Sequence, residues 1–475
     1  MIVKKKLIFF TLILFGIYIR IFNINYDNLW FDEILSFWIA DPILLFQESF
    51  NRHKSIEQIP FLYNFLLKIF FNFFGYDSLY GRYLSLILNV FGIIFATNIC
   101  RMIKNDNSYL LALFLFSTNI FLINYSQELR PYSLVFFLCS AYLYLFYKIK
   151  NTQKDINYNL INFFLINISQ VLMIMSHPFC LIIFFSTSLH LLNNYLKKNI
   201  NSKILTYSFI FGSIFSILYI YFYLKNLNSF PSWIKQPDLK FYTNFYFSSF
   251  FGSRLMGLYH LIILLFLFIF FLKKNKKLKQ NLEILFFIIF LSYFLPIAYG
   301  YLNRPIIFPR YIIYILIPII VAISVLIFEI KSKLIKNILI IITLLLNFGN
   351  HFSEATFRQF MEKRPFYKPN FESMIKIIND SNRKYYSIKM SIDTNKISIV
   401  NSAISSYIKN IKLNKSNSQL EYIAIKNFND SSLNDLWVIC LPDVVKDRCI
   451  NKDLNFKVLK EKNIPGIKMI LISKI

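Results

Sequence analysis

Long apolar segments separated by short polar connections dominate the first 350 residues of the chain. A helix that crosses a bilayer needs about 20 predominantly apolar residues, because it rises about 1.5 Å per residue through about 30 Å of hydrocarbon. By this criterion eleven segments are predicted to be membrane-spanning helices. They lie near residues 7–24, 80–100, 108–124, 131–147, 157–176, 178–196, 204–224, 257–272, 284–301, 311–328 and 337–350.

The polar connections between these segments predict the orientation of the chain. Lys and Arg in short loops stay on the cytoplasmic side of a membrane, and here they gather in every second connection. If the N-terminus is inside, the cytoplasmic segments hold 19 basic residues and 4 acidic ones. Because the number of predicted spans is odd, the residues after 350 should lie outside. The pattern predicts a multi-pass protein of the plasma (inner) membrane with a cytoplasmic N-terminus and an extracytoplasmic tail.

Two hydrophilic regions are long enough to have structure of their own. The loop at residues 25–78 is rich in Trp, Tyr and Phe, which suits short helices in the membrane interface. The tail at 351–475 has a lower apolar density, and its pattern predicts one helix and several short strands. The helix is expected at 369–379, and the strands at 385–390, 397–400, 422–425, 436–441 and 469–472.

These patterns together predict the fold class. It is an α-helical polytopic membrane protein with about eleven transmembrane helices and a small C-terminal α/β soluble domain. The transmembrane domain is expected at residues 1–350, including the long external loop at 25–78, and the external α/β domain at 351–475. No internal repeat divides the membrane region into similar halves.

The composition changes the interpretation of the net charge. Of the 475 residues, 56% are apolar and 16% are charged, whereas a soluble domain averages about 45–50% and about 25%. A low charge fraction excludes an intrinsically disordered chain. The formal charge of +27 would favour nucleic acid in a polar protein. Most of that excess lies in predicted cytoplasmic loops, so no nucleic-acid partner is predicted, and the run Lys273–Lys279 is interpreted as facing lipid headgroups.

Cysteine and histidine contribute little to the predicted chemistry. Three cysteines lie in predicted spans, where thiols behave as small apolar groups. Cys440 and Cys449 lie in the tail, where an oxidising compartment permits a disulfide but nothing in the sequence requires one. The five histidines show no zinc-binding spacing such as HExxH, and no glycine-rich phosphate loop occurs. Neither a metal nor a cofactor is predicted, and ATP-driven transport is disfavoured.

Seven acidic residues gather in the first external loop, and two of them are adjacent. Asp32 and Glu33 follow Trp30 and Phe31 in an apolar, aromatic setting. Desolvation in such a place raises the pKa of a carboxylate toward the range that suits a general base. The alternative is that the pair faces water or caps an interfacial helix.

Some arginines lie at the predicted outer ends of spans, whereas most basic residues lie in the predicted cytoplasmic connections. Such exceptions are expected to have an anionic partner. Arg82, Arg130, Arg304 and Arg310 occupy such positions. A lipid phosphate is an apt candidate, because a guanidinium donates in a planar fork that matches phosphate oxygens. Alternatively, the arginines bind lipid headgroups nonspecifically, and Arg130 forms a snorkelling ion pair with Glu128.

His177 lies at another predicted outer span end, directly before Pro178. A single histidine in such a place is more often a hydrogen-bonded structural residue than a ligand.

Several short motifs follow one another along the chain on one predicted external face. They are Leu29-Trp30-Phe31-Asp32-Glu33 with Ser36, Pro60-Phe61-Leu62-Tyr63 with Lys68 and Phe74-Gly75, Arg82-Tyr83-Leu84-Ser85, Tyr125-Ser126-Gln127-Glu128-Leu129-Arg130-Pro131-Tyr132-Ser133, and Pro309-Arg310-Tyr311 with Pro318. In this order and topology they resemble the GT-C integral-membrane glycosyltransferases, specifically the bacterial group related to protein O-mannosyltransferases and lipid A aminoarabinose transferases (glycosyltransferase family 39-like). The resemblance covers about residues 1–330. The chain departs from the family at Ile59-Pro60-Phe61, which has one proline and lacks its polar neighbour.

The resemblance implies an activity and a role for each cluster. The family transfers a sugar from a polyprenyl-phosphate carrier to a hydroxyl acceptor (glycan, lipid or protein) at the external membrane face. It implies a hexosyl- or pentosyltransferase that inverts the sugar carbon, with Asp32 as general base and Glu33 as a secondary or positioning carboxylate. The donor phosphate is expected at Arg82, Arg130 and Arg310. Further substrate contacts are expected at Glu128, Tyr63, Tyr132, His177 and Arg304.

Three other readings stay open at this point. A multi-span polysaccharide polymerase or ligase would have its large external loop between late spans, whereas here that loop follows the first span. A lipid or sugar transporter without covalent chemistry would favour charges within the spans and two similar halves. A receptor-like scaffold would bind its partner through the tail.

Overall fold

The computed structural model divides the chain into two compact units. It describes residues 2–25, 27–57, 59–104, 106–151, 156–196, 203–224, 234–272, 276–352, 368–381, 383–389, 397–411, 420–423, 433–441 and 456–474. The first unit, called here the membrane unit, comprises Met1–Phe22, Glu57–Leu66 and Tyr83–Thr356. The second, called the loop–tail unit, comprises Asn23–Ile56, Leu67–Arg82 and Phe357–Ile475.

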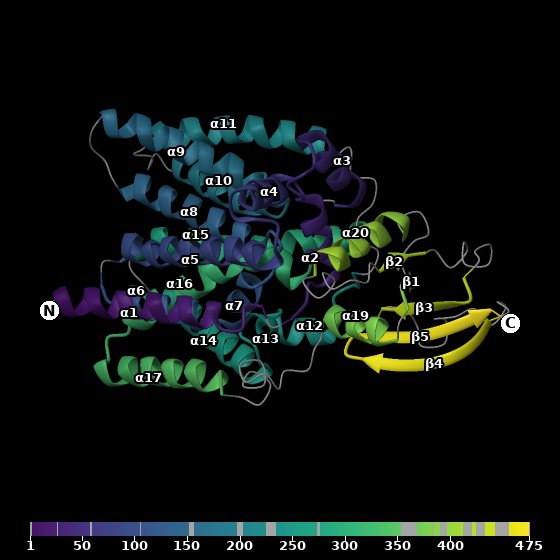
Figure 1. Cartoon of the computed structure of the whole chain (residues 1–475). Helices are drawn as coiled ribbons and strands as arrows, with labels where there is room; N and C mark the ends of the chain where they lie inside the picture. Colours follow the sequence, from purple (N-terminus) through teal and green to yellow (C-terminus); the bar gives the residue numbers. More distant parts are fainter. Residues whose placement is uncertain are drawn as a thin grey trace. The chain divides into compact units, whose positions relative to one another are not determined.

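The membrane unit is helical, and its long helices run side by side (Figure 1). Its elements are α1 (Ile2–Ile21), α5 (Ser78–Ile103, from Tyr83 on), α6 (Ser108–Thr118), α7 (Ile120–Ser126), α8 (Tyr132–Asn151), α9 (Ile156–Ile174), α10 (Cys180–Leu196), α11 (Lys203–Tyr219), the π-helical η1 (Ile220–Leu224), α12 (Leu239–Asn244), α13 (Phe247–Phe250), α14 (Arg254–Leu272), α15 (Lys276–Leu302), the 3₁₀ element η2 (Pro309–Ile315), α16 (Leu316–Phe328) and α17 (Lys333–Asn350).

Each predicted span coincides with one of these helices or with a consecutive pair. Within the described residues, six helices are long and apolar enough to cross a membrane. The pair α6 and α7, bent by 55°, would make a seventh. The shorter apolar helices include parts of α9, α10 and α14. The chain is therefore a polytopic helical membrane protein, as predicted, while the count of eleven stays a prediction.

Helix α16 forms the centre of the membrane unit. Its residues from Leu316 to Ile327 are all buried, and the helix packs against α6, α14 and α15. Helix α17, in contrast, buries little more than Thr343 and Asn347. An apolar helix with so much exposed surface is expected to contact lipid, because lipid tails solvate apolar side chains.

The loop–tail unit contains a five-stranded mixed sheet of order β2-β1-β3-β5-β4. The strands are β1 (Tyr385–Lys389), β2 (Glu421–Tyr422), β3 (Asp435–Cys440), β4 (Phe456–Ile464) and β5 (Ile467–Lys474). Strands β2, β1 and β3 are parallel, and β3, β5 and β4 are antiparallel. Strand β3 is buried from Leu436 to Cys440, so both faces of the sheet are covered there.

The helices of this unit come from both ends of the sequence. They are α2 (Phe31–Ile39), α3 (Phe46–Ile56), the second part of α4 (Leu62–Phe74), α19 (Phe371–Asp380) and α20 (Ile397–Asn410). Helix α2 packs against α20. The short helices predicted in the first loop are therefore present, and they belong to the same compact unit as the tail.

Most tail elements lie where the sequence predicts them, with two exceptions. The predicted strand at 397–400 is wrong, because these residues begin α20. The buried residues of α20 repeat every three or four positions, as on one face of a helix; they are Val400, Ala403, Ile404, Tyr407 and Ile408. This helical spacing extends further along the chain than the short β-branched run at its start. Strand β4 was not predicted, since its side chains are mainly exposed.

Candidate functional site

The carboxylate of Glu33 is fully buried at the start of α2. Glu33 accepts a hydrogen bond from the backbone N–H of Trp30 at 2.8 Å, which satisfies a donor at the helix N-terminus. Its carboxylate also lies 2.7 Å from Nζ of Lys368 and 3.9 Å from Nη2 of Arg82. Burial alone would raise the pKa of Glu33, but these two cations outweigh burial and hold the pKa below its usual value. Glu33 is therefore held in its ionised form at the start of α2, and its role as a positioning carboxylate stays a prediction.

Asp32 differs from its neighbour in its surroundings. It lies in the same first helical turn but is only partly buried. Its backbone carbonyl accepts from Oγ of Ser36 at 3.3 Å, while the side chain keeps some solvent access. Of the two adjacent carboxylate residues, Asp32 is the more exposed.

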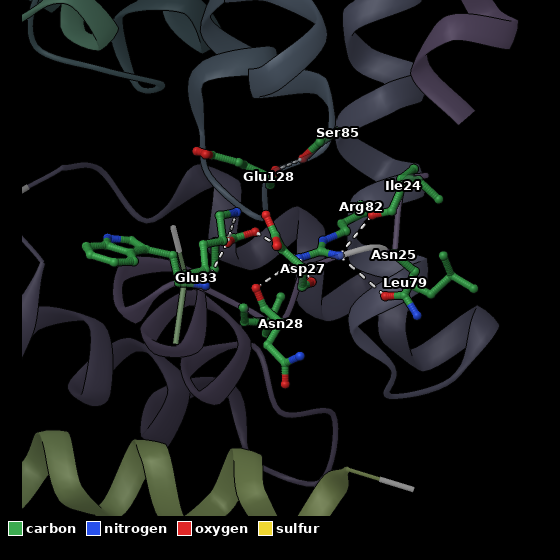
Figure 2. Close-up of polar contacts among 12 residues, drawn as sticks. Ile24, Asn25, Asp27, Asn28, Glu33, Leu79, Arg82, Ser85 and Glu128 are labelled. Atoms are coloured by element: carbon green, nitrogen blue, oxygen red, sulfur yellow. Dashed lines mark hydrogen bonds and ion pairs between the residues drawn. The ribbon is translucent and has the colours of Figure 1, made fainter. Parts of the chain in front are cut away.

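Arg82 binds the backbone that leads into α2. It is 2% exposed, and it donates to the carbonyl oxygens of Ile24 and Asp27 at 2.9 and 2.8 Å (Figure 2). With its ion pair to Glu33, this arrangement fixes the shape of the chain before Asp32. A donor phosphate at Arg82 stays a prediction, and these contacts favour a positioning role instead.

A second group of candidate residues meets in the membrane unit. Arg310 lies 5.7 Å from the Tyr132 ring centre and 5.7 Å from that of Tyr311, and the ring of Tyr311 is 5.2 Å from that of His177. Arg130, 6% exposed, pairs with Glu57 at 2.6 Å. Apart from Glu57, these residues come from three separate parts of the chain: the start of α8, the connection between α9 and α10, and η2. We call Arg130, Tyr132, His177, Arg310 and Tyr311 the cationic cluster.

His177 is a neutral member of this cluster. Burial, together with the charges of Arg130 and Arg310, lowers its pKa to about 3. Its Nδ1 accepts a hydrogen bond from the backbone N–H of Phe179 at 3.2 Å. The neutral ring therefore carries its proton on Nε2, and it adds a hydrogen-bond donor without adding charge.

Tyr63 supports the loop that carries Arg130. Oγ of Ser85 donates to the backbone carbonyl of Glu128 at 2.6 Å (Figure 2). The hydroxyl of Tyr63 lies 3.1 Å from the same Oγ. Because the single proton of Ser85 goes to Glu128, Tyr63 is the donor in that pair. Glu128 itself is half-buried, and Arg304 is exposed in the connection before η2. Their predicted substrate contacts stay predictions.

The sequence analysis missed Arg20, which is fully buried in the membrane unit. Its guanidinium donates to the carbonyl oxygens of Ser117 and Phe116 at 2.8 and 3.1 Å. These carbonyls lose helical partners at the bend between α6 and α7, where Asn119 caps the second helix. Arg20 thus replaces the hydrogen bonds that the bend removes. A charge within a predicted span was the available signal.

Further bonds connect Arg20 to the cationic cluster. Nε of Arg20 donates to Oδ1 of Asn89 at 3.0 Å, and Nδ2 of Asn89 contacts Oγ of Ser133 at 3.4 Å. The amide of Gln127 donates back to the carbonyl of Arg20 at 3.0 Å. Gln127 and Ser133 flank the segment that contains Arg130 and Tyr132. We call these bonds the Arg20 network, and they fix the geometry of that segment.

The remaining sequence predictions concern metal and disulfide chemistry. In the described part of the chain, no group of three or more His, Cys, Asp or Glu residues is arranged to hold a metal ion. Cys440 ends β3 and is disulfide-bonded, but Cys449 lies outside the described residues, so the pairing of the two stays a prediction.

Comparisons with known proteins identify the architecture. No family model and no curated protein matches the sequence. The structure is similar to the crystal structure of ArnT from Cupriavidus metallidurans bound to undecaprenyl phosphate, with a TM-score of 0.59 and 8% identity over 98% of this chain and 97% of ArnT. ArnT in the apo state gives a TM-score of 0.60. The chain has the GT-C fold.

A second GT-C structure agrees with this assignment. The archaeal oligosaccharyltransferase AglB from Archaeoglobus fulgidus, in complex with an inhibitory peptide and a dolichol-phosphate, has a TM-score of 0.53 and 11% identity. The match covers 92% of this chain and 69% of AglB. The fold implied by the sequence motifs is therefore confirmed, and the match covers nearly the whole length of ArnT.

Proposed function

We propose that this protein transfers a sugar from a polyprenyl-phosphate-linked donor to a hydroxyl acceptor at the external face of the plasma membrane, with inversion at the sugar carbon. The observation that carries the proposal is the cationic cluster in the membrane unit of a GT-C fold. It combines two arginines with a neutral histidine and two tyrosines. Two structures of the same fold contain a polyprenyl or dolichol phosphate, which supports a lipid-phosphate donor.

The cationic cluster is proposed to hold the donor phosphate. When the bond between the sugar carbon and the phosphate oxygen breaks, its electron pair stays on the phosphate and increases the negative charge there. Arg310 and Arg130 stabilise that charge, and the Nε2–H of His177 donates a hydrogen bond to it. Because the lipid phosphate leaves readily as an anion, the reaction needs no general acid.

Asp32 is proposed as the general base. The acceptor oxygen forms a bond to the sugar carbon from the side opposite the phosphate, and its proton passes to the carboxylate of Asp32. Glu33 is unsuited to this step, because a proton on Glu33 would break its buried ion pairs with Lys368 and Arg82. Glu33, Lys368 and Arg82 instead hold the start of α2 in place.

The test is direct transfer by the full-length protein in lipid nanodiscs. Polyprenyl-phosphate sugars with a radiolabelled sugar are supplied with a membrane extract as the source of acceptors, and loss of label from the carrier is measured. Asp32→Asn should abolish transfer, whereas Glu48→Gln, in the first turn of α3, should leave it unchanged. Full activity of Asp32→Asn would overturn the assignment of the base. If label stays on every carrier supplied to the wild-type protein, the proposed function is wrong.

A further inference from the structure

Helix α17 is the last helix of the membrane unit, and it lies beside α14 (Figure 1). Most of its large apolar side chains are exposed, including Leu334, Ile341 and Leu345, which suits a surface that faces lipid tails. Its buried residues are polar instead, namely Thr343 and Asn347. Close packing and interhelical hydrogen bonds hold helices together in a membrane, and in α17 the buried part of the interface is polar.

Four polar side chains attach the end of α17 from one face of the helix. Their spacing of four, three and one positions places them on one side, because a helix repeats every 3.6 residues; they are Thr343, Asn347, Asn350 and His351. The hydroxyl of Tyr259 lies 2.6 Å from that of Thr343, and Nε2 of His260 lies 3.3 Å from Nδ2 of Asn347. Asn350 donates to the carbonyl of Phe251 at 2.9 Å. These three contacts connect α17 with α14 and with the end of α13.

The fourth contact reaches a different element, the break between α6 and α7. Nε2 of His351 donates to the carbonyl of Thr118 at 2.7 Å. Thr118 is the last residue of α6, and the chain bends there by 55° into α7. Carbonyls at the end of a helix have no partner within it, and a buried carbonyl without a hydrogen bond is costly. His351 therefore stabilises the bent form of the chain.

The first and the last helix of the membrane unit share the carbonyls at this break. Arg20, on α1, donates to the carbonyls of Phe116 and Ser117 at 3.1 and 2.8 Å. His351, at the end of α17, donates to the next carbonyl along the chain. Three consecutive carbonyls thus have their donors on two helices that are far apart in sequence. Each helix supplies donors for only part of the break, so the bent form depends on both.

The break in turn sets the position of Arg130. Helix α7 has only 7 residues, and Arg130 follows soon after its end. Asn119 caps α7 by accepting from the N–H of Leu122, and it donates to the carbonyl of Phe250 at 2.9 Å. A short helix that is capped at its first turn carries a rotation at the break to its far end. A change in the bend would therefore displace Arg130 relative to the rest of the cationic cluster.

We infer that His351 is a positioning residue of the proposed donor-phosphate site, and that it acts by holding the break between α6 and α7. This inference rests on the proposed function and adds a residue to the same site. The effect is indirect, because the imidazole binds the Thr118 carbonyl, that contact fixes the direction of α7, and α7 places Arg130. A helix that mainly faces lipid thus contributes to donor binding through the residue at its end.

Binding of undecaprenyl phosphate to the full-length protein in lipid nanodiscs, measured by native mass spectrometry, tests the inference without catalysis. His351→Ala removes the donor to Thr118 and should raise the Kd about 2- to 30-fold, the range expected for a residue that couples to a site through other residues. His351→Gln places an amide N–H near the position of Nε2 and should bind almost as tightly as the wild type. His351→Asn has the same amide on a shorter side chain, so it should resemble His351→Ala.

Variants earlier on α17 separate positioning from attachment of the helix. Thr343→Val and Asn347→Leu remove hydrogen bonds to α14 and leave the break untouched. Both should lower the melting temperature in detergent and leave the Kd unchanged. An equal rise of the Kd in these controls would overturn the inference, because His351 would then only attach α17. The same holds if His351→Ala binds like the wild type, or if His351→Gln binds no better than His351→Asn.

The transfer assay distinguishes failure of the inference from failure of the proposed function. His351→Ala should raise the donor KM, whereas a loss of folded protein would lower kcat, leave KM unchanged and contradict the positioning role. A wild-type protein that binds undecaprenyl phosphate but transfers no sugar would contradict the proposed function, and the Kd values of the variants would still decide the role of His351. Absence of undecaprenyl phosphate binding in the wild type would contradict both.

Discussion

Nζ of Lys368 lies 2.7 Å from the carboxylate of Glu33, a residue 335 positions earlier in the chain. Lys368→Met should remove this pair and leave Glu33 with Arg82 at 3.9 Å. Loss of one partner of a buried ion pair costs up to about 3–5 kcal/mol. We therefore expect a marked fall in the apparent melting temperature in detergent. Lys376→Met, at an exposed position of α19, is the control, and an equal effect of both changes would contradict the role of the pair.

The same pair predicts an acid-sensitive component of stability. The folded state holds the pKa of Glu33 below that of the unfolded chain, which is about 4.3. The contribution of Glu33 is complete above the unfolded pKa and is lost as the pH falls through the lower folded pKa. Melting temperatures measured from pH 6 downward should fall more steeply below about pH 4.3 for the wild type than for Glu33→Gln. Parallel curves would count against this assignment.

Substitutions of Asp32 and of Glu33 should have different effects, although the two residues are adjacent in the chain. Asp32→Asn removes the proposed base and should lower kcat by about 10²- to 10⁴-fold with little change in melting temperature. Glu33→Gln should lower the melting temperature, because it leaves Lys368 and Arg82 without their anion. Steady-state transfer rates and thermal unfolding of both variants provide the comparison. A stable, inactive Glu33→Gln with an active Asp32→Asn would reverse the two roles.

Substitution of Arg310 should change the kinetic parameters for the lipid-phosphate donor. Arg310→Ala removes a cation from the proposed phosphate site, and loss of a charge-assisted contact costs about 1.5–3 kcal/mol. The expected result is a rise in donor KM or a fall in kcat of about 10- to 150-fold in total. Donor saturation curves measure it. Arg254→Ala, at the exposed start of α14, serves as the comparison, and unchanged saturation in Arg310→Ala would indicate a purely structural role.

His177 should not titrate in the physiological range. Its pKa of about 3, against an ordinary 6.5, means that protonation begins only in strong acid. The pH dependence of kcat between about pH 5 and 8 should therefore have the same shape in His177→Asn and in the wild type, even if the variant is slower. An inflection near 6.5 that disappears in the variant would show that His177 is charged during turnover.

Arg20 should influence the donor through the Arg20 network. Arg20→Lys keeps the charge but cannot reach Asn89 and the carbonyls of Phe116 and Ser117 together, and each buried group left unsatisfied costs about 1–3 kcal/mol. Arg20→Lys should lower the melting temperature and also raise donor KM, because Arg130 follows Gln127. Arg101→Lys, which alters a cation that stacks on Tyr109, should leave donor KM unchanged. A loss of stability alone would restrict Arg20 to the fold.

The helical class of the protein could be predicted because long apolar runs have few structural solutions in a membrane. The tail was predicted where local pattern and tertiary packing agree, as in Leu436–Cys440. At Ile397–Val400 the local β-branched run indicated a strand, and the helical spacing through Ile408 decided otherwise. Strand β4 could not be predicted from a pattern of buried apolar residues, because its side chains are mainly exposed. It is held instead by backbone hydrogen bonds to β5, which follows the turn at Pro465-Gly466.

The candidate site could be predicted by residue type more readily than by role. Arg130 and Arg310 were identified because basic residues are unexpected at outer span ends. The structure brings both near His177. Only the family resemblance gave Asp32 and Glu33 different roles, because their local sequence setting is the same; in the structure Glu33 is buried and Asp32 is partly buried. The ion pair to Lys368 depends on a contact across most of the chain, which no local pattern encodes. Arg20 could have been singled out as a charge within a predicted span, but its role could not be predicted, since its partners lie on other helices.

The loop–tail unit combines early and late residues of the chain, so it can be completed only late in synthesis. A ribosome that has added Glu33 must still add 335 residues to reach Lys368, and α20 follows later still. During that interval Glu33 lacks one of its two cations, and the face of α2 that packs on α20 is uncovered. The membrane helices are therefore synthesised before the ion pair between Glu33 and Lys368 can form.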